Sequence, residues 1–183
     1  EEDGRGPVQD KLAELASRLR LTLVAGTFPL RVPGETRVAA ASLVYGPDGT
    51  RLGRYDKIHL FDVSVPGASE SHRESAGMVP GREVVVVPTP AGRVGVAVCY
   101  DLRFPELFRS MKNVDIIVLP SAFTETTGKM HWEVLVRARA IENLSYVIAA
   151  AQGGYHVNGR ETHGNSMIVD PWGRVMDELQ RGS

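Results

Sequence analysis

The chain has 183 residues, enough for one domain with a sizeable hydrophobic core and no need of cross-links. Its 22 acidic and 21 basic residues nearly cancel and no basic cluster stands out, which argues against nucleic acid or an anionic membrane as the main partner. One cysteine excludes an internal disulfide framework, and the absence of a long apolar run or a signal-peptide pattern further favours a soluble protein of the reducing cytoplasm.

The first half of the chain predicts one helix followed by strands. Pro7 is typical of a first helical turn, and apolar residues then recur on one helical face, at Val8, Leu12, Leu15 and Leu19. Strands are expected at 21–26, 38–45 and 51–56. The segment 27–37 is rich in turn residues and predicts a connection, and a Gly-Pro-Asp-Gly turn joins the last two strands.

The second half predicts strands that alternate with helices. Residues 62–81 lose periodicity and gain Ser, Gly, Pro and charge, which is typical of a functional or mobile loop. Strands are then expected at 84–87, 94–98, 115–120, 146–151, 166–170 and 174–179, helices at 105–111 and 131–143, and a polar loop at 152–164. The second of these helices is expected to carry Arg137 and Arg139 on a basic face. Hairpins mixed with strand–helix–strand crossings predict mixed sheets covered by outer helices, a layered α/β architecture.

Cys99 lies where a strand is expected to end and a helix to begin. The β-branched run 94–98 precedes it, and Pro105 and Glu106 are typical of the first turn of the following helix. Backbone N–H groups at such a place are unpaired and the helix dipole favours an anion, so a thiolate and a developing oxyanion would both be stabilised. The alternative is a buried structural thiol, which is the commoner fate of a lone cysteine.

Other polar residues carry weaker signals. Lys57 follows a strand and Glu74 lies in the long loop, but each taken alone reads as a surface charge. His59 alternates with Lys57, so an extended segment would point both the same way. The remaining candidates for a pocket are His131, His156 and His163, beside polar loops. Ligand spacings argue against structural zinc, and with no phosphate loop or dinucleotide fingerprint we expect neither a metal nor a cofactor.

Several segments resemble the nitrilase (carbon–nitrogen hydrolase) superfamily. In chain order they are Tyr55-x-Lys-x-His-Leu60, Glu74–Gly81, Gly95–Leu107, Pro120–Phe123, His131–Asn143, Ala149–Gln152 and Gly164–Gly173. The resemblance covers nearly the whole chain. Arg-Phe-Pro-Glu-Leu after the cysteine and the Ala-Ala-Ala-Gln strand end are most similar to the Nit branch, above all to the deaminated glutathione amidases.

The resemblance implies an αββα sandwich of two mixed sheets with outer helices, and a Glu–Lys–Cys triad. Cys99 matches the nucleophile, and Lys57 matches the lysine that holds the oxyanion together with the backbone N–H of Tyr100. Glu74 matches a second glutamate that helps orient the lysine and the substrate. Arg103 is a candidate partner for substrate carboxylates, or equally a structural ion-pair partner. The resemblance calls for no cofactor.

The chain also departs from the family pattern. The first catalytic glutamate, the general base, precedes the helix that begins here at Pro7, and Glu1 and Glu2 fall too late to match it. The family usually adds terminal strands and a tail after the position of Arg181, and this sequence does not include them. The segment 109–115 is slightly shorter than in the family pattern. We therefore expect residues 1–183 to be a single carbon–nitrogen hydrolase domain that is incomplete at both ends and inactive as given, either as part of a longer protein or as a truncated homologue.

The expected activity of the complete protein is hydrolysis of a small linear amide to carboxylate and ammonia through a cysteine thioester. Deaminated glutathione is the first choice of substrate and an omega-amidase the second. Nitrile or N-carbamoyl hydrolysis is a further alternative, because the same thiolate serves all of them. A catalytically inactive interaction module on the same fold is the alternative of another class. The resemblance also implies a homodimer or higher homo-oligomer, formed through the helix after the nucleophile and the 132–143 helix.

Overall fold

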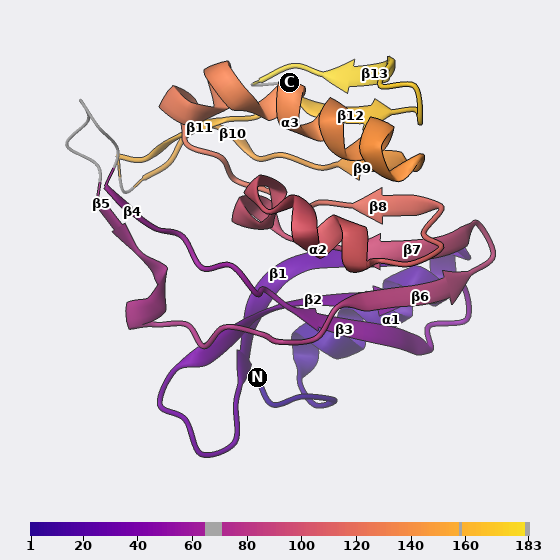
Figure 1. Cartoon of the computed structure of the whole chain (residues 1–183). Coiled ribbons are helices and arrows are strands. Elements are labelled where there is room, and N and C mark those ends of the chain that lie inside the picture. Colours follow the sequence, from indigo (N-terminus) through magenta and orange to yellow (C-terminus); the bar gives the residue numbers. More distant parts are fainter. Residues whose placement is uncertain (65–70, 158, 182–183) are drawn as a thin grey trace. The chain divides into compact units, whose positions relative to one another are not determined.

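The computed structural model describes residues 1–64, 71–157 and 159–181, which form two compact units, Glu1–Glu83 and Val84–Ser183 (Figure 1). Each unit combines a β-sheet with helices. Part of the loop predicted at 62–81, namely 65–70, and one position of the loop predicted at 152–164, Asn158, lie outside the described residues. In the part of the chain that the structure describes, no helix is both long and apolar enough to cross a membrane.

The first unit contains a three-stranded antiparallel sheet and one long helix. Its elements are α1 (Pro7–Leu19), β1 (Leu23–Arg31), β2 (Val38–Tyr45), β3 (Arg51–Asp56), β4 (Asp62–Ser64), β5 (Ser71–Arg73) and the 3-10 turn η1 (Glu74–Ala76). The sheet order is β1-β2-β3, and β4 and β5 form a separate antiparallel pair. The predictions for α1, β2 and β3 are confirmed. The prediction of an irregular loop was wrong at 62–64 and 71–76, where the structure has β4, β5 and η1.

The connection predicted at 27–37 was wrong over its first five residues. β1 continues through Thr27, Phe28 and Pro29 to Arg31, with a register shift between Ala25 and Phe28. Pro29 suggested a turn, but β1 is an edge strand of the described sheet, where a residue without an N–H group is tolerated. Aromatic and β-branched side chains then prevail over the turn signal.

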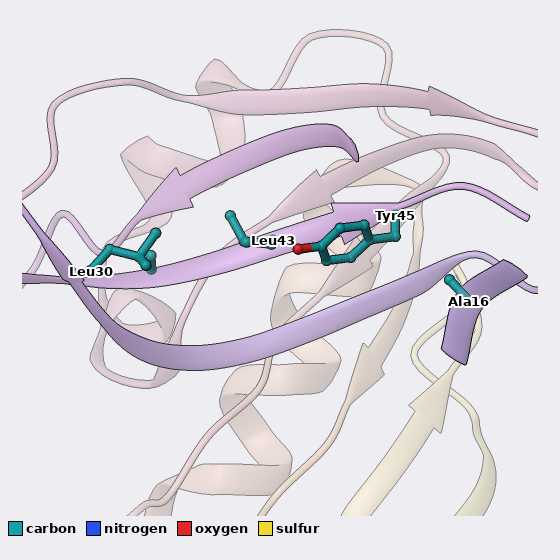
Figure 2. Close-up of a cluster of buried hydrophobic side chains, with 5 residues drawn as sticks. Ala16, Leu30, Leu43 and Tyr45 are labelled. Atoms are coloured by element: carbon teal, nitrogen blue, oxygen red, sulfur yellow. The ribbon is translucent and has the colours of Figure 1, made fainter. Parts of the chain in front are cut away.

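The core of the first unit lies between α1 and β2. A buried cluster joins the helix to the sheet through Ala16, Leu30, Ala41, Leu43 and Tyr45 (Figure 2). Leu43, Tyr45 and Ala41 alternate along β2 and so share one face of the sheet. The small side chain at Ala16 lets the helix approach that face closely.

The buried face of α1 is rotated relative to the predicted one. Val8 and Leu19 are 46% and 54% exposed, while Gln9 and Ala16 are buried. Alanines face the sheet because the chain comes very close there: a Cβ atom at Gly49, in the β2–β3 turn, would lie 2.7 Å from the Ala13 carbonyl oxygen. Gly49 also has a φ of +83°, which favours glycine.

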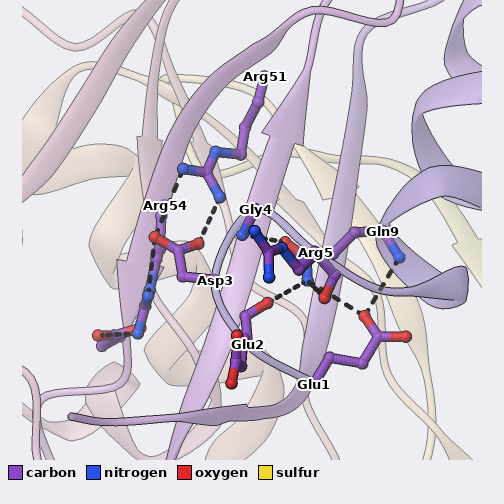
Figure 3. A network of polar contacts seen from close by, with 9 residues as sticks. Glu1, Glu2, Asp3, Gly4, Arg5, Gln9, Arg51 and Arg54 are labelled. Carbon is purple, nitrogen blue, oxygen red and sulfur yellow. Dashed lines mark hydrogen bonds and ion pairs between the residues drawn. The ribbon is translucent and has the colours of Figure 1, made fainter.

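The helix α1 receives its N-terminal cap from Glu1. Gly6, at the N-cap position, has no side chain with which to cap, and the Val8 N–H donates to Glu1 Oε1 at 2.7 Å. Gln9 Nε2 donates to Glu1 Oε2 at 3.1 Å (Figure 3). The hydrogen bond from the Val8 N–H holds the pKa of Glu1 below its ordinary value. Glu1 therefore serves the helix end.

Asp3 ties the N-terminal segment to β3. Its carboxylate pairs with Arg51 and, at 3.1 Å, with Arg54 (Figure 3). Burial raises the pKa of Asp3, but the hydrogen bond and charge of Arg51, helped by Arg54, outweigh it and hold this pKa below its ordinary value. The ionised form of Asp3 is thus the one that the folded chain favours.

The second unit is built on a six-stranded mixed sheet with the order β13-β12-β9-β8-β7-β6. Its elements are β6 (Val85–Thr89), β7 (Gly92–Val96), η2 (Cys99–Arg103), α2 (Pro105–Ser110), β8 (Ile116–Val118), α3 (Glu125–Asn143), β9 (Tyr146–Ala149), β10 (Gly153–Tyr155), β11 (Glu161–His163), β12 (Ser166–Val169) and β13 (Val175–Leu179). β7, β8 and β9 are parallel and the other pairs antiparallel. The mixed α/β architecture is confirmed.

Parallel strands that follow one another in the sheet place their crossover helices on the same face. α2 connects β7 to β8 and α3 connects β8 to β9, and the two helices contact each other (Figure 1). α3 also contacts β9 and β12, whose buried residues are Val147, Ala149, Met167 and Val169. Trp132 of α3 is 1% exposed and its Nε1–H donates to the Asn165 carbonyl oxygen at 2.7 Å.

Three predictions for this unit need correction. α3 begins at Glu125, six residues before the predicted start, so His131 lies within the helix. The loop predicted at 152–164 contains the β10–β11 hairpin, whose short polar strands give little periodicity. Arg137 and Arg139 do not share a face, because residues two apart on a helix point about 200° apart. Arg139 is buried and Arg137 is exposed.

Candidate active site

The Cys99 turn joins the end of β7 to the helical segment η2. Cys99 has a φ of +49°, in the left-handed region that residues with a Cβ atom rarely adopt. Its N–H donates to the Pro120 carbonyl oxygen at 3.0 Å, which connects the turn to the end of β8. Cys99 is a free cysteine of intermediate burial. A strained turn that presents a reachable side chain is typical of a functional position.

Asp101 stabilises the turn from inside. Its side chain is fully buried, and its Oδ2 accepts a hydrogen bond of 2.8 Å from the N–H of Val98, the residue before the cysteine. The Asp101 N–H in turn donates to the Val98 carbonyl oxygen at 3.0 Å. These two bonds enclose Cys99 and keep its backbone in the left-handed conformation. Sequence reasoning missed this role, although a carboxylate two residues after the candidate nucleophile was a usable signal.

Arg139 of α3 stabilises the same turn from its C-terminal side. Its Nε and Nη2 both donate to the Leu102 carbonyl oxygen, at 3.0 and 2.8 Å. Its Nη1 donates to Glu142 at 2.7 Å, and its guanidinium lies 5.3 Å from the centre of the Phe108 ring. A buried charge with this many partners is well satisfied. The sequence suggested a solvated basic face for Arg139, so this contact was missed as well.

Lys57 and Glu74 form a partly buried ion pair in the first unit. The Lys57 Nζ atom lies 2.5 Å from Glu74 Oε2, and Lys57 is only 4% exposed. The same carboxylate oxygen accepts a hydrogen bond of 2.6 Å from the Phe61 N–H. An ammonium group has three donors, so Lys57 can bind Glu74 and a further anionic oxygen at once. The structure therefore brings together two residues that stand seventeen positions apart.

The backbone of Lys57 is also fixed. Its N–H donates to the Ala40 carbonyl oxygen at 3.0 Å, and its own carbonyl accepts from the Gly81 N–H at 2.9 Å. Gly81 permits this close contact, because a Cβ atom there would lie 2.0 Å from the Asp56 carbonyl oxygen. The chain bends at 58–59, so the alternation expected to align His59 with Lys57 does not apply.

Arg103 is the last residue of η2 in the second unit. Tyr100 lies in the same segment, directly after the cysteine. The Arg103 guanidinium carbon lies 6.0 Å from the centre of the Tyr100 ring and 5.5 Å from that of Phe123. Both terminal guanidinium nitrogens lie 3.3 Å from His131 Nδ1. Arg103 thus stands beside the candidate nucleophile on a short, braced segment, with aromatic and histidine contacts.

The other two candidate histidines serve the β10–β11 hairpin. His163 Nδ1 lies 3.2 Å from Glu125 Oε2, and His156 Nε2 lies 2.8 Å from the Thr162 hydroxyl oxygen. Gly128 of α3 gives His163 room, since a Cβ atom there would lie 2.3 Å from the His163 Cβ atom. Among the described residues, no group of three or more His, Cys, Asp or Glu side chains is arranged to hold a metal ion.

The two sheets, their helices and the cysteine at a strand-to-helix turn have the elements of a nitrilase-like α/β protein. The chain belongs to the carbon-nitrogen hydrolase family, whose model matches residues 1–183. The resemblance noted from the sequence motifs is therefore confirmed.

Curated relatives place the chain close to the Nit branch. It is 47% identical over 171 residues to a deaminated glutathione amidase of Synechocystis, covering 90% of this chain and 62% of that protein. It is 40% identical over 181 residues to one of Dictyostelium discoideum, covering 97% and 62%. The omega-amidase NIT3 of Saccharomyces cerevisiae is 35% identical over 173 residues, covering 93% and 59%. The chain thus spans about three fifths of these relatives.

Solved structures agree with this family assignment. The NitFhit protein of Caenorhabditis elegans has a TM-score of 0.86 and 41% identity, and covers 94% of this chain and 43% of its own. Nit3 of Saccharomyces cerevisiae, a member of branch 10 of the nitrilase superfamily, has a TM-score of 0.87 and 30% identity, with 100% and 65% covered. The predicted fold class, the nitrilase-like αββα type, is confirmed by these similarities.

Proposed function

We propose that the complete protein is a cofactor-free thiol amidase that hydrolyses a small linear amide, with deaminated glutathione as its substrate. The observation that carries the proposal is the partly exposed cysteine in a strained turn between β7 and η2. The names of the relatives at 40–47% identity support the choice of substrate. We further propose that the protein acts in the cytoplasm, since its single cysteine fits a reducing compartment.

The reaction has two halves. A glutamate of the longer polypeptide takes the Cys99 thiol proton, and the sulfur attacks the amide carbon to form a tetrahedral oxyanion. The C–N bond breaks, and the nitrogen takes that proton and leaves as a free amine, which is cysteinylglycine from deaminated glutathione and ammonia from a primary amide. A thioester remains. Water then attacks the thioester carbon, which releases the carboxylic acid and restores the thiol. Nothing is oxidised or reduced.

Each further site residue has a proposed role. Lys57 and the backbone N–H of Tyr100 stabilise the oxyanion, and the buried position of Lys57 supports this because a charge acts more strongly where water is excluded. Glu74, at 2.5 Å from Lys57 Nζ, orients the ammonium and balances its charge. Arg103 binds a carboxylate of the substrate remote from the scissile amide.

An omega-amidase is the second candidate. The yeast protein of that name is similar in both sequence and structure, so α-ketoglutaramate is the competing substrate. Both substrates carry a carboxylate beyond the amide, so both suit the role proposed for Arg103. They differ in length, and the ratio of kcat/KM between them decides between the two activities.

We also propose a homodimer that forms through α3. Large apolar side chains at four- and seven-residue intervals stay exposed on this helix: Met130 at 72%, Val134 at 66% and Ile141 at 49%. An apolar stripe of this spacing fits the same stripe of a second copy. Sedimentation of the full-length protein at micromolar concentration tests this, and a monomeric mass there contradicts it.

The decisive experiment measures the amine released by the full-length protein: cysteinylglycine from deaminated glutathione, and ammonia from α-ketoglutaramate and from a nitrile. We expect deaminated glutathione to be preferred and the Cys99→Ala variant to release none while keeping its melting temperature within a few degrees. A preference for α-ketoglutaramate selects the omega-amidase. Activity retained in Cys99→Ala removes Cys99 from the mechanism. A folded wild-type protein that is silent on all substrates refutes the amidase proposal in favour of a non-catalytic module.

A further inference from the structure

His131 is placed to control Arg103 without neutralising it. It projects from α3, whereas Arg103 belongs to η2, twenty-eight residues earlier. A guanidinium has N–H donors and no acceptor, so Arg103 donates and His131 Nδ1 accepts, at 3.3 Å from both Nη1 and Nη2. Nδ1 therefore carries a lone pair, and in the ring form that accepts this bond the proton resides on Nε2.

The contact defines both the position and the plane of the guanidinium. A single acceptor equidistant from Nη1 and Nη2 lies on the edge between these two nitrogens. The rings of Tyr100 and Phe123 add two further contacts, at 6.0 and 5.5 Å from the guanidinium carbon. Phe123 is 5% exposed, so at least one of these supports is itself firmly packed. Three side chains thus converge on one guanidinium that would otherwise have several free rotamers.

The chemistry of the acceptor matters as much as its place. A carboxylate at position 131 would also orient Arg103, but it would cancel the positive charge that an anionic ligand requires. A neutral imidazole orients the guanidinium and leaves its charge for the ligand. The second fork of the guanidinium, formed by Nε and a terminal nitrogen, matches the two oxygens of a carboxylate.

We propose that His131 is a positioning residue that presents Arg103 to the remote carboxylate of the substrate. This rests on the proposed function, and it deepens it by naming a determinant of specificity for amides that carry a second, anionic end. His131 touches neither the scissile amide nor Cys99 in this role. It acts on substrate binding, so its effect should appear in KM and not in kcat.

Three variants of the full-length protein separate position from charge. His131→Leu removes the acceptor and should raise KM for deaminated glutathione about fivefold, the worth of one hydrogen bond near solvent. His131→Gln restores a neutral acceptor and should return KM to within about twofold of the wild type. His131→Glu should raise KM the most, by about tenfold or more, because it pairs the guanidinium with a fixed anion. In all three, kcat should stay within about twofold.

Two controls make the test specific. Butyramide has no carboxylate, so its KM should be the same in the wild type and in all three variants. Glu133→Gln changes an exposed residue two positions along α3, whose ion pair is with Arg137, and should leave both substrates unaffected. An equal rise in KM for both amides, or no rise in His131→Leu, overturns the proposal.

A binding measurement keeps this inference distinct from the amidase proposal. Calorimetric titration of glutarate, a dicarboxylate without an amide, into the Cys99→Ala protein should give an affinity that His131→Leu weakens about fivefold and His131→Gln preserves. If the wild type hydrolyses none of the amides but this binding pattern holds, the amidase fails and the role of His131 stands. If the amides are hydrolysed and glutarate binding is indifferent to residue 131, or glutarate does not bind, the role of His131 is refuted.

Discussion

The Lys57–Glu74 pair and the Cys99 turn are held in place by different physics. Lys57 is a buried charge whose placement depends on one carboxylate, 2.5 Å away, and Glu74 in turn depends on the Phe61 N–H. Cys99 has a strained backbone conformation, and three hydrogen bonds hold its turn: from the Val98 N–H to Asp101, from Arg139 to the Leu102 carbonyl, and from the Cys99 N–H to the Pro120 carbonyl. A charge needs one strong partner, whereas a strained turn needs several modest ones. One substitution in the Lys57–Glu74 pair should therefore cost much stability, whereas one substitution around the Cys99 turn should cost less because the other hydrogen bonds remain.

The largest effect should come from removing the carboxylate of the ion pair. Glu74→Ala leaves the Lys57 ammonium buried without its partner, and we expect a loss of about 2–4 kcal/mol in the free energy of unfolding, measured by urea titration. Glu14→Ala, which removes the partner of exposed Lys11, should leave the free energy of unfolding close to that of the wild type.

The double variant Lys57→Met/Glu74→Leu sharpens this result. It removes both charges, so it should recover at least half of the stability that Glu74→Ala loses, although we expect it to be inactive. A double variant as unstable as the single one would mean that packing, and not the unpaired charge, dominates at this place.

The Cys99 turn should lose less when one of its supports is weakened. Arg139→Lys keeps the positive charge but loses the planar guanidinium, which donates two hydrogen bonds to the Leu102 carbonyl and one to Glu142. We expect a loss of about 1–2 kcal/mol in urea unfolding, because Asp101 still holds the other side of the turn. Arg174→Lys, at a side chain that is 78% exposed, is the control and should lie within about 0.5 kcal/mol of the wild type. A loss at Arg139 as large as at Glu74 would break the distinction drawn above.

The smallest effect should come from an exposed ion pair. The folded-state pKa of Asp3 is lowered, so its contribution is present above the unfolded-state pKa of about 4 and disappears as the pH falls through the lower folded value. Its side chain is 40% exposed and solvent screening is strong, so Asp3→Asn should cost only about 0.5 kcal/mol at pH 7. Thermal unfolding of both proteins at pH 7 and near pH 2 checks this. A difference that grows in acid would contradict the assigned direction.

Local patterns in the chain predict much of the fold. Val38–Tyr45 and Arg51–Asp56 were predicted to the residue, because a tight turn separates them and defines both strands. The prediction failed at Pro29, where an edge position makes proline acceptable, and at the β10–β11 hairpin, whose three-residue strands contain too little pattern. Those outcomes depend on neighbours that are distant in sequence.

The candidate site divides in the same way. Cys99 could be located from the residues alone, because valines before it and Pro105 after it mark a strand end and a helix start. Lys57 and Glu74 could be singled out only through the family resemblance, since each looks like a surface charge until the fold pairs them. Arg139 was misread because a charged residue on a helix is usually solvated, and only the packing of α3 on the Cys99 turn reveals its use.

The positive φ of Cys99 has a consequence for how this chain can change over time. A left-handed conformation costs a residue with a Cβ atom about 1–2 kcal/mol, and glycine escapes most of that cost. Selection for stability alone would therefore favour replacing the sulfur-bearing residue, although its replacement would abolish the proposed chemistry. A lineage that no longer needs the reaction can drift toward glycine here and keep its fold. The residue type at position 99 of a related protein thus indicates whether selection still maintains its catalytic activity.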